Sequence, residues 1–231
     1  MTGFAFDIVA FDLDGTLFDT SADLAGALNH ALQQLGRPSL PLPRVKAMIG
    51  QGTRHMLALA LEATGGCTPV LLERCYPELM RFYEANLTVH TKPYPGLAET
   101  LEALTSAGVK LAVVTNKVER LATELLEAMG VAHVFSTVIG GDTLGPGTAK
   151  PSPLPVIEMI KRCGGGRAAF VGDSRFDIEA ARNAGVPSIA VSFGFLGGGV
   201  HALGADAVID HFVELVPALV RLGGRNHRSM A

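Results

Sequence analysis

The chain of 231 residues alternates short apolar runs with longer amphipathic stretches over most of its length. Short runs rich in β-branched and aromatic residues are typical of buried strands. They predict strands at residues 4–11, 109–115, 134–139, 168–172, 187–191 and 207–209. Because helical patterns separate most of the later runs, we expect the strands to lie parallel in one sheet.

Between the later strands, apolar residues recur at the spacing of one helix face. They predict helices at residues 96–106, 118–129, 154–162, 176–184 and 211–222. Glycines follow the first four of these stretches and are typical helix stop signals. This alternation indicates an α/β fold whose core is a Rossmann-like, doubly wound parallel sheet.

Residues 20–92 depart from this alternation, because they contain helical patterns and no convincing strand. The helical patterns cover residues 21–35, 42–48, 53–63 and 69–86. Since the first strand must pair with strands that begin only after residue 93, this block has to leave the sheet and return. The sequence therefore predicts an inserted all-helical cap domain above the carboxyl end of the first strand, where open α/β sheets bind ligands.

These patterns divide the chain into three parts. The α/β core is expected to comprise residues 1–19 and 93–222, and the cap residues 20–92, with linkers at residues 17–21 and 91–95. Residues 223–231 are polar and contain glycine, so they are expected to form a flexible tail.

Composition narrows the range of partners. The formal net charge is −3 and no basic block is present, so nothing indicates nucleic acid or an anionic membrane surface as a partner. No run approaches the roughly 20 apolar residues that a membrane span requires. Cys67, Cys75 and Cys163 lack the spacing of a zinc site or a disulfide framework, which favours a reducing, cytoplasmic setting. A small molecule is the expected partner, and monomer and homodimer both remain open.

Polar residues follow several of the predicted strands. Because parallel strands end at the same edge of a sheet, we expect these residues to meet in one crevice. They are Asp12, Asp14, Thr115, Asn116, Lys150, Asp173 and Asp177. Each residue alone is compatible with a turn or a helix cap, but the combination indicates a shared site.

Asp12 and Asp14 are the most informative members of this set. Residues two apart on an extended chain point the same way, and two carboxylates that share a site either hold a proton or bind a cation. Phosphoryl transfer needs a hard cation, a Lys and hydroxyl or backbone donors around the transferred group. Carboxylates suit Mg²⁺, and Asp12 and Asp173 with one backbone carbonyl form a sufficient protein contribution.

Four motifs carry a resemblance to a known family. DLDGT (residues 12–16), TNK (115–117), KPSP (150–153) and GDSRFD (172–177) resemble, in order and spacing, the motifs of the haloacid-dehalogenase superfamily. The resemblance runs from about residue 9 to residue 193 and includes a helical cap between the first and second motifs. Within the superfamily, residues 49–52, 93–96 and 140–142 look most like the phosphoglycolate phosphatase group.

The resemblance implies a catalytic role for four residues. Asp12 would be the nucleophile that forms an aspartyl-phosphate, and Asp14 would protonate the leaving alkoxide and then deprotonate the hydrolytic water. Thr115, with the backbone around Asn116, would hydrogen-bond the phosphoryl group, and Lys150 would offset its charge.

The resemblance also implies a metal site and leaves the specificity residues open. Its metal residues would be Asp12, Asp14, Asp173 and Asp177, where Asp177 either binds Mg²⁺ or orients a metal-bound water. Arg54 is a candidate for binding a substrate carboxylate, although a solvent-facing arginine early in a helix is an equal alternative. Lys117 is expected to be solvated.

The expected activity is Mg²⁺-dependent hydrolysis of a small phosphomonoester, with phosphoglycolate as the leading substrate. Asp14 would supply an acid for an alkoxide leaving group, which disfavours dehalogenation. Sugar-phosphate hydrolysis, pyrophosphatase and phosphomutase activity remain alternatives. A non-enzymatic binding protein is disfavoured, because a degenerate relative should have lost at least one of Asp12, Asp14, Lys150 and Asp173.

Overall fold

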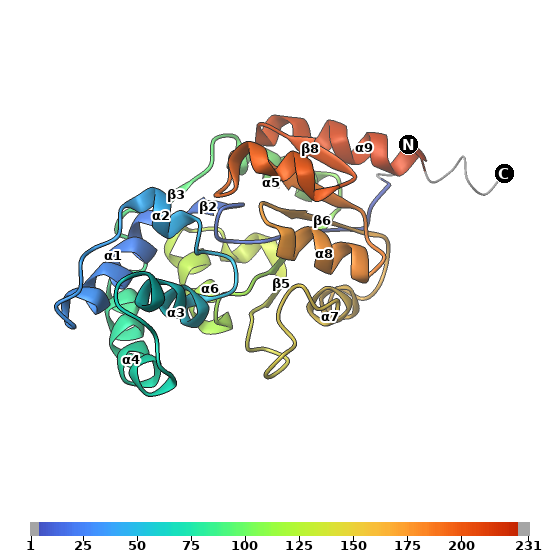
Figure 1. Ribbon diagram of the computed structural model, residues 1–231. Coiled ribbons are helices and arrows are strands. Elements are labelled where there is room, and N and C mark those ends of the chain that lie inside the picture. The colour runs from blue at the N-terminus through green and yellow to red at the C-terminus, as the bar shows by residue number, and fades with distance from the viewer. Residues whose placement is uncertain (1–4, 226–231) are drawn as a thin grey trace.

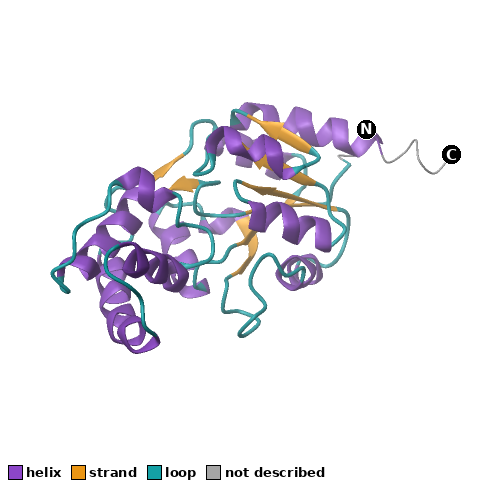
Figure 2. Cartoon of the chain, in the orientation of Figure 1, coloured by secondary structure: helices purple, strands orange, loops and turns teal. Residues whose placement is uncertain are grey.

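A six-stranded parallel sheet forms the centre of the protein. In the computed structural model, which describes residues 5–225, the strand order is β5-β4-β1-β6-β7-β8, and each neighbouring pair is parallel. The strands are β1 (Ile8–Phe11), β4 (Lys110–Val114), β5 (Phe135–Ile139), β6 (Ala168–Gly172), β7 (Ser188–Val191) and β8 (Ala207–Ile209). Figure 2 shows them in orange. The fold-class prediction is confirmed.

Helices cover both faces of the sheet (Figure 1). They are α5 (Leu97–Ser106), α6 (Glu119–Ala128), α7 (Leu154–Arg162), α8 (Arg175–Asn183) and α9 (Leu215–Arg225). In β1, Val9 and Phe11 pack into the core with α5, α6 and α9, whereas Ile8 and Ala10 pack into the core with α7 and α8. A strand buried on both faces needs apolar residues at every position, which explains the uninterrupted apolar run.

Residues 20–92 contribute no strand to this sheet. They form α1 (Ser21–Gln33), α2 (Leu42–Lys46), α3 (Thr53–Ala63) and α4 (Pro69–Ala85), which lie together at the left of Figure 1. Their apolar faces meet in a buried cluster that includes Leu28, Leu57 and Leu79. We propose that residues 20–92 form a separate domain, which we call the cap.

The two crossings between core and cap pair with each other. β2 (Phe18–Asp19) and β3 (Lys92–Pro93) form a two-stranded antiparallel ribbon, with Phe18 opposite Pro93 and Asp19 opposite Lys92. The sequence predicted only linkers here, because two-residue strands are too short to show an alternating pattern. The ribbon places the entry to the cap beside its exit.

The C-terminal helix α9 begins four residues later and ends three residues later than predicted. Short 3-10 helices at Ala132–Val134, Gly197–Leu203 and Phe212–Glu214 were not predicted, and the last of them precedes α9. Residues 223–225 belong to α9, so the prediction that the flexible tail begins at Gly223 is wrong, and residues 226–231 lie outside the described residues. A Cβ at Gly223 would lie 2.0 Å from the Ala5 Cβ, so this glycine serves close packing. Across residues 5–225, no helix is both long enough and apolar enough to cross a membrane.

Candidate active site

The polar residues at the strand ends meet where the sheet order reverses. β1 lies between β4 and β6, so the chain winds away from it in both directions, and such a switch point is where open α/β sheets bind ligands. Asp12 directly follows β1, Thr115 follows β4 and Asp173 follows β6. The register of these three strands therefore brings residues more than 100 positions apart to one edge.

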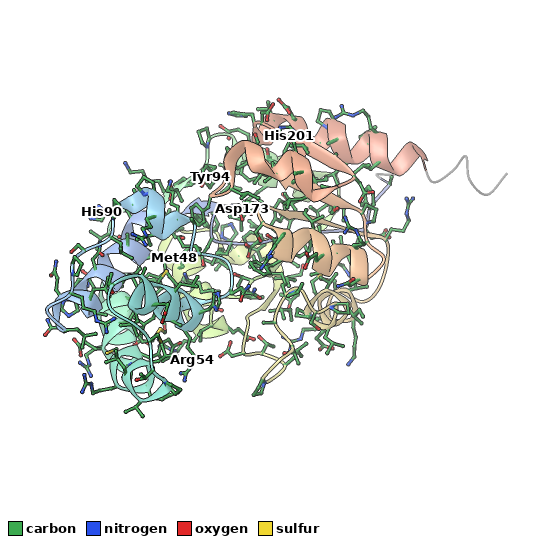
Figure 3. All side chains as sticks on the ribbon, in the orientation of Figure 1. Met48, Arg54, His90, Tyr94, Asp173 and His201 are labelled. Atoms are coloured by element: carbon green, nitrogen blue, oxygen red, sulfur yellow. The ribbon has the colours of Figure 1, made fainter. Side chains whose placement is uncertain are left out.

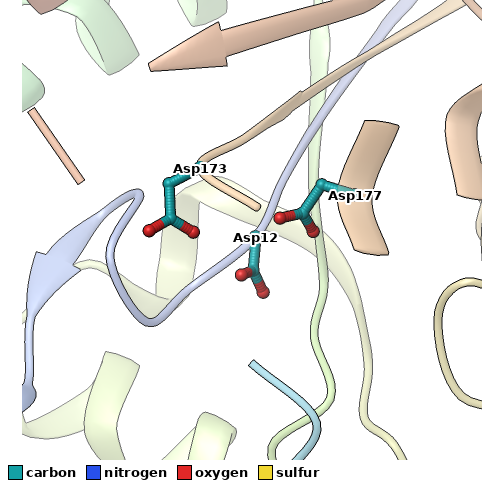
Figure 4. A group of neighbouring side chains, drawn as sticks. All are labelled: Asp12, Asp173 and Asp177. Carbon is teal, nitrogen blue, oxygen red and sulfur yellow. The ribbon is translucent and has the colours of Figure 1, made fainter. Parts of the chain in front are cut away.

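Three buried carboxylates form an acidic cluster at this edge. Asp12, Asp173 and Asp177 each offer an oxygen that lies within 4.8 Å of the others (Figure 4). Their exposed fractions are 8%, 3% and 0%. Carboxylates at this separation repel one another in a medium of low polarity, so the ionised cluster requires a compensating cation.

Burial, together with this repulsion, raises the pKa values of Asp12 and Asp173. Burial raises the pKa of Asp12 to about 6, opposed by Lys150 and reinforced by Asp177 and Asp14. Burial also raises the pKa of Asp173 well above its usual value, and Asp177 and Asp12 add to the shift. Hard oxygen donors with this excess of negative charge fit a hard divalent cation such as Mg²⁺.

Lys150 supplies one positive charge to the cluster. Its Nζ lies 2.8 Å from Asp12 Oδ1 and 2.6 Å from Asp177 Oδ1, and it donates to the Val114 carbonyl at 2.8 Å. Burial lowers the pKa of Lys150, but the two carboxylates outweigh this effect and raise it above its usual value. The structure therefore holds a charged lysine against the predicted nucleophile.

Asp177 uses both of its carboxylate oxygens within the protein. Oδ1 contacts Lys150, and Oδ2 accepts from the Ser174 backbone N–H at 3.0 Å and from its hydroxyl at 2.6 Å. These contacts form a capping box at the start of α8. The Ser174 contacts orient the Asp177 carboxylate, and this carboxylate in turn holds Lys150. Both oxygens of Asp177 already accept hydrogen bonds, so a direct metal contact would require one of them to be shared.

Asp14 is held by two other groups. Thr20 donates its hydroxyl to Asp14 Oδ1 at 2.7 Å, and Lys117 Nζ lies 3.1 Å and 3.2 Å from the two oxygens. The Lys117 side chain is only 2% exposed, so the expectation that Lys117 is solvated is wrong. Tyr83 of α4 covers this lysine, and no local sequence pattern indicates a contact between such distant residues.

Asn116 connects the second and third motifs to the cap. Its Nδ2 donates to the Gly50 carbonyl at 2.8 Å and to the Lys150 carbonyl at 3.0 Å, and its Oδ1 accepts from the Lys150 N–H at 2.8 Å. The Thr115 hydroxyl accepts from the Lys117 N–H at 3.2 Å, and its own proton is free to donate. A cavity of about 30 Å³ between Asp12, Thr115 and the cap leaves room for about one water.

A larger cavity of about 480 Å³ adjoins Asp14 and Asp173. It lies between cap and core, and the cap lines it with residues 46–51 and His55. Lys46 and Arg175 add cationic groups. Lys46 pairs with Asp19 at 3.2 Å, whereas Arg175 lies 4.8 Å from the Phe176 ring centroid and has no carboxylate partner within residues 5–225.

The comparisons with known proteins agree with this arrangement. A family model described as haloacid dehalogenase-like hydrolase matches residues 9–191. This span covers most of the chain and all four motifs. The chain belongs to the haloacid dehalogenase-like hydrolase family.

Named relatives of this hydrolase cover nearly its whole length. A phosphoglycolate phosphatase of Caulobacter vibrioides is 43% identical over 219 residues, which cover 93% of this chain and 91% of the relative. One from Agrobacterium fabrum is 42% identical over 216 residues, covering 92% and 91%. The crystal structure of a predicted phosphoglycolate phosphatase from Haemophilus somnus matches with a TM-score of 0.84 and 32% identity, covering 92% of this chain and 97% of that one.

Arg54 lies apart from the site of this hydrolase. Its guanidinium forms an ion pair with Glu73 of α4 and lies 5.3 Å from the Tyr76 ring centroid. It lines neither cavity, and Figure 3 shows it away from Asp173. The structure therefore does not bring Arg54 to the site, because the first turn of α3 directs it toward a neighbouring cap helix, while His55 lines the larger cavity.

The loop that follows β7 also contacts the acidic cluster. Phe195 donates its N–H to Asp173 Oδ2 at 2.7 Å. Gly194 packs so closely that a Cβ would lie 2.3 Å from the Asp173 Cβ, and Gly15, at φ +86°, would place one 2.3 Å from Asp173 Oδ2. The glycine-rich stretch at residues 194–199 was the available signal, although only Gly194 of its glycines lies against Asp173, where the buried carboxylate leaves no room for a side chain.

Proposed function

We propose that this hydrolase is a Mg²⁺-dependent phosphatase that cleaves a small phosphomonoester, with phosphoglycolate as its leading substrate. One observation carries the proposal: the Asp12 carboxylate lies at the switch point of the sheet, 2.8 Å from Lys150 and within the acidic cluster. The two relatives above, both named phosphoglycolate phosphatase, support the substrate class.

The residues that would hold Mg²⁺ are Asp12 and Asp173, together with a backbone carbonyl from the Asp14 segment, while Asp177 lies beside them. When bound, the ion would neutralise the cluster and the charge of the transferred phosphoryl group. Lys150 already compensates part of the charge of Asp12 and Asp177. The cluster therefore has a place for one further cation.

In the proposed reaction, Asp12 is the nucleophile and Asp14 transfers the protons. An oxygen of Asp12 attacks phosphorus, the bond from phosphorus to the ester oxygen breaks, and the alcohol leaves with a proton from Asp14. Asp14 then takes a proton from water, which attacks the aspartyl-phosphate and releases inorganic phosphate and Asp12. The Thr115 hydroxyl and the backbone near Asn116, which line the smaller cavity beside Asp12, would donate to the phosphoryl oxygens, and Lys150 would offset their charge.

The larger cavity favours a substrate whose leaving group is small and negatively charged. It begins at Asp14 and is lined by Lys46, His55 and Arg175. A carboxylate two carbons from the phosphoryl group would lie near the cationic groups of Lys46 and Arg175, of which Arg175 has no acidic partner among the described residues. Sugar phosphates and pyrophosphate are the alternative substrates that the following experiment separates.

The test is release of inorganic phosphate from phosphoglycolate, hexose and pentose phosphates, nucleotides and pyrophosphate, with Mg²⁺ and with EDTA. We expect phosphoglycolate to have the highest kcat/KM, by about tenfold or more, and activity to require the metal. Asp12→Asn should lower kcat by about a thousandfold or more. Glu102→Gln, an exposed carboxylate on α5, is the matched control and should have no effect.

Two results would contradict the proposal. Turnover retained in Asp12→Asn, with an unchanged melting temperature, would exclude Asp12 as the nucleophile. A hexose phosphate or pyrophosphate with a kcat/KM far above that of phosphoglycolate would replace the proposed substrate while leaving the phosphatase chemistry in place.

A further inference from the structure

Lys117 lies at a junction between core, cap and the predicted proton donor. It follows Thr115 and Asn116 on the core side, its Nζ contacts both Asp14 oxygens, and it also contacts the hydroxyl of Tyr83. Tyr83 is fully buried near the end of α4, which belongs to the cap. No step of the reaction described above uses Lys117 or Tyr83.

We propose that Lys117 is a positioning residue that holds the Asp14 carboxylate in the orientation needed for proton transfer. Tyr83 in turn holds Lys117, so the orientation of Asp14 depends on the packing of the cap against the core. The inference rests on the proposed phosphatase function and extends it to two residues that touch neither the nucleophile nor the acidic cluster.

The contact geometry explains how Lys117 positions Asp14. An ammonium 3.1 Å and 3.2 Å from the two oxygens restricts rotation of the carboxylate about its own axis. The Thr20 hydroxyl, 2.7 Å from Oδ1, supplies a second point of attachment. Without Lys117, the Thr20 contact would remain, and a single hydrogen bond leaves the carboxylate plane free to turn. Proton transfer requires the donor within hydrogen-bond distance of the ester oxygen.

Tyr83 holds Lys117 through two features of its side chain. The hydroxyl contacts Nζ, and the Lys117 Nζ also lies 4.7 Å from the Tyr83 ring centroid, within the range of a cation–π interaction. Both contacts come from α4, so any displacement of that helix from the core would remove them together. The lysine would then gain water and rotamer freedom, and Asp14 would lose its fixed orientation.

Substrates with different leaving groups can show whether Lys117 positions a proton donor or has only a structural role. An alkoxide departs poorly without a proton, whereas the phenolate of an aryl phosphate departs without one. We therefore compare kcat/KM for phosphoglycolate with kcat/KM for p-nitrophenyl phosphate in Lys117→Met and Tyr83→Phe. Because kcat/KM includes the steps up to formation of the aspartyl-phosphate, it reports on loss of the first leaving group.

We expect Lys117→Met to lower kcat/KM for phosphoglycolate by about a hundredfold, and for p-nitrophenyl phosphate by no more than about threefold. Tyr83→Phe keeps the ring and its packing, and should produce the same selectivity with a loss of about five- to tenfold. Tyr76→Phe on the same helix and Lys161→Met, whose side chain is 79% exposed, are the matched controls and should leave the ratio unchanged.

Equal losses of kcat/KM for both substrates in Lys117→Met would assign Lys117 a structural role and overturn the inference. A ratio of the two kcat/KM values that is unchanged in both Lys117→Met and Tyr83→Phe would also overturn it. If Lys117→Met fails to fold, the ratio of the two kcat/KM values in Tyr83→Phe tests the inference: a selective loss for phosphoglycolate supports it, and an unchanged ratio overturns it. Absence of Asp12-dependent hydrolysis of either substrate by the unsubstituted protein would overturn the proposed function and, with it, this inference.

Discussion

At the scale of single residues, Asp173 is the carboxylate whose ionisation the fold opposes most clearly. Burial raises its pKa, and Asp177 and Asp12 raise it further, against the backbone N–H of Phe195 and the charge of Lys150. The ionised form therefore destabilises the folded protein unless a cation is bound. Each pKa unit corresponds to about 1.4 kcal/mol.

This repulsion predicts that Asp173→Asn stabilises the metal-free protein. The cost of ionising Asp173 in the fold is absent below its unfolded pKa, near 3.8, and is complete above its raised folded pKa. The melting temperature in EDTA should therefore exceed that of the unsubstituted protein by about 2–4 °C at pH 7.5, with the difference vanishing toward pH 4. Thermal unfolding across this pH range provides the measurement.

If the cluster binds Mg²⁺ as proposed, the ion should reverse the order of the two proteins at pH 7.5, because it would stabilise the fold that carries the complete cluster. Glu102→Gln, an exposed carboxylate, is the control and should follow the unsubstituted protein in both conditions. A variant that melts lower in EDTA at every pH would mean that the Asp173 contacts outweigh the repulsion.

At the scale of elements, Asp23 joins the beginning of the cap to its end. It lies in the first turn of α1 and is 4% exposed. Its carboxylate accepts from the N–H of His90 at 2.9 Å and 3.0 Å, and from the N–H and hydroxyl of Thr91, both at 2.8 Å. These bonds lie next to the β2–β3 ribbon and fix the same crossing.

Asp23→Ala should lower the free energy of unfolding by about 2–4 kcal/mol, because it removes charge-assisted bonds and leaves the donors of His90 and Thr91 without their partner. Denaturant titration followed by circular dichroism measures the change. Glu102→Ala on α5 removes an exposed carboxylate and should cost less than about 0.5 kcal/mol. Similar losses in the two variants would show that this contact does not secure the cap.

At the scale of the whole molecule, we propose that the cap moves about the ribbon during turnover and that the loop before α3 makes the closing contact. Gly50 accepts a hydrogen bond from Asn116 of the core, and a Cβ at Gly52 would lie 3.2 Å from the Asn116 carbonyl. Gly52 also has a φ of +82°, which disfavours other residues. These two glycines therefore bring the cap backbone against Asn116 of the core.

Gly52→Ala should therefore impair activity as well as stability. Gly66, at φ +92° and with no atom within 4 Å of an added Cβ, provides a control with similar backbone strain and no clash. Both alanine variants should lose about 1–2 kcal/mol of stability, but only Gly52→Ala should lower kcat/KM, by about tenfold. Equal activities in the two variants would exclude a closing contact at Gly52.

The amino-acid pattern is sufficient to predict the six strands of the main sheet and the polar residues at their ends, and hence most of the candidate site. Because β1 is buried on both faces, its apolar run was unbroken, and because parallel strands end at one edge, Asp12, Thr115 and Asp173 had to lie near one another. Local periodicity also distinguished the helical cap from the core. These features depend on short-range patterns and on sheet geometry, which a single chain displays directly.

Contacts between distant parts of the chain determine which polar side chains face the site and which are buried elsewhere. Lys117 is buried because Tyr83, 34 residues away, covers it, whereas Arg54 turns to Glu73 instead of the cavity. Gly223 continues a helix because its missing side chain admits Ala5. Each outcome depends on contacts between residues distant in the sequence, and neither periodicity nor local propensity carries information about such contacts.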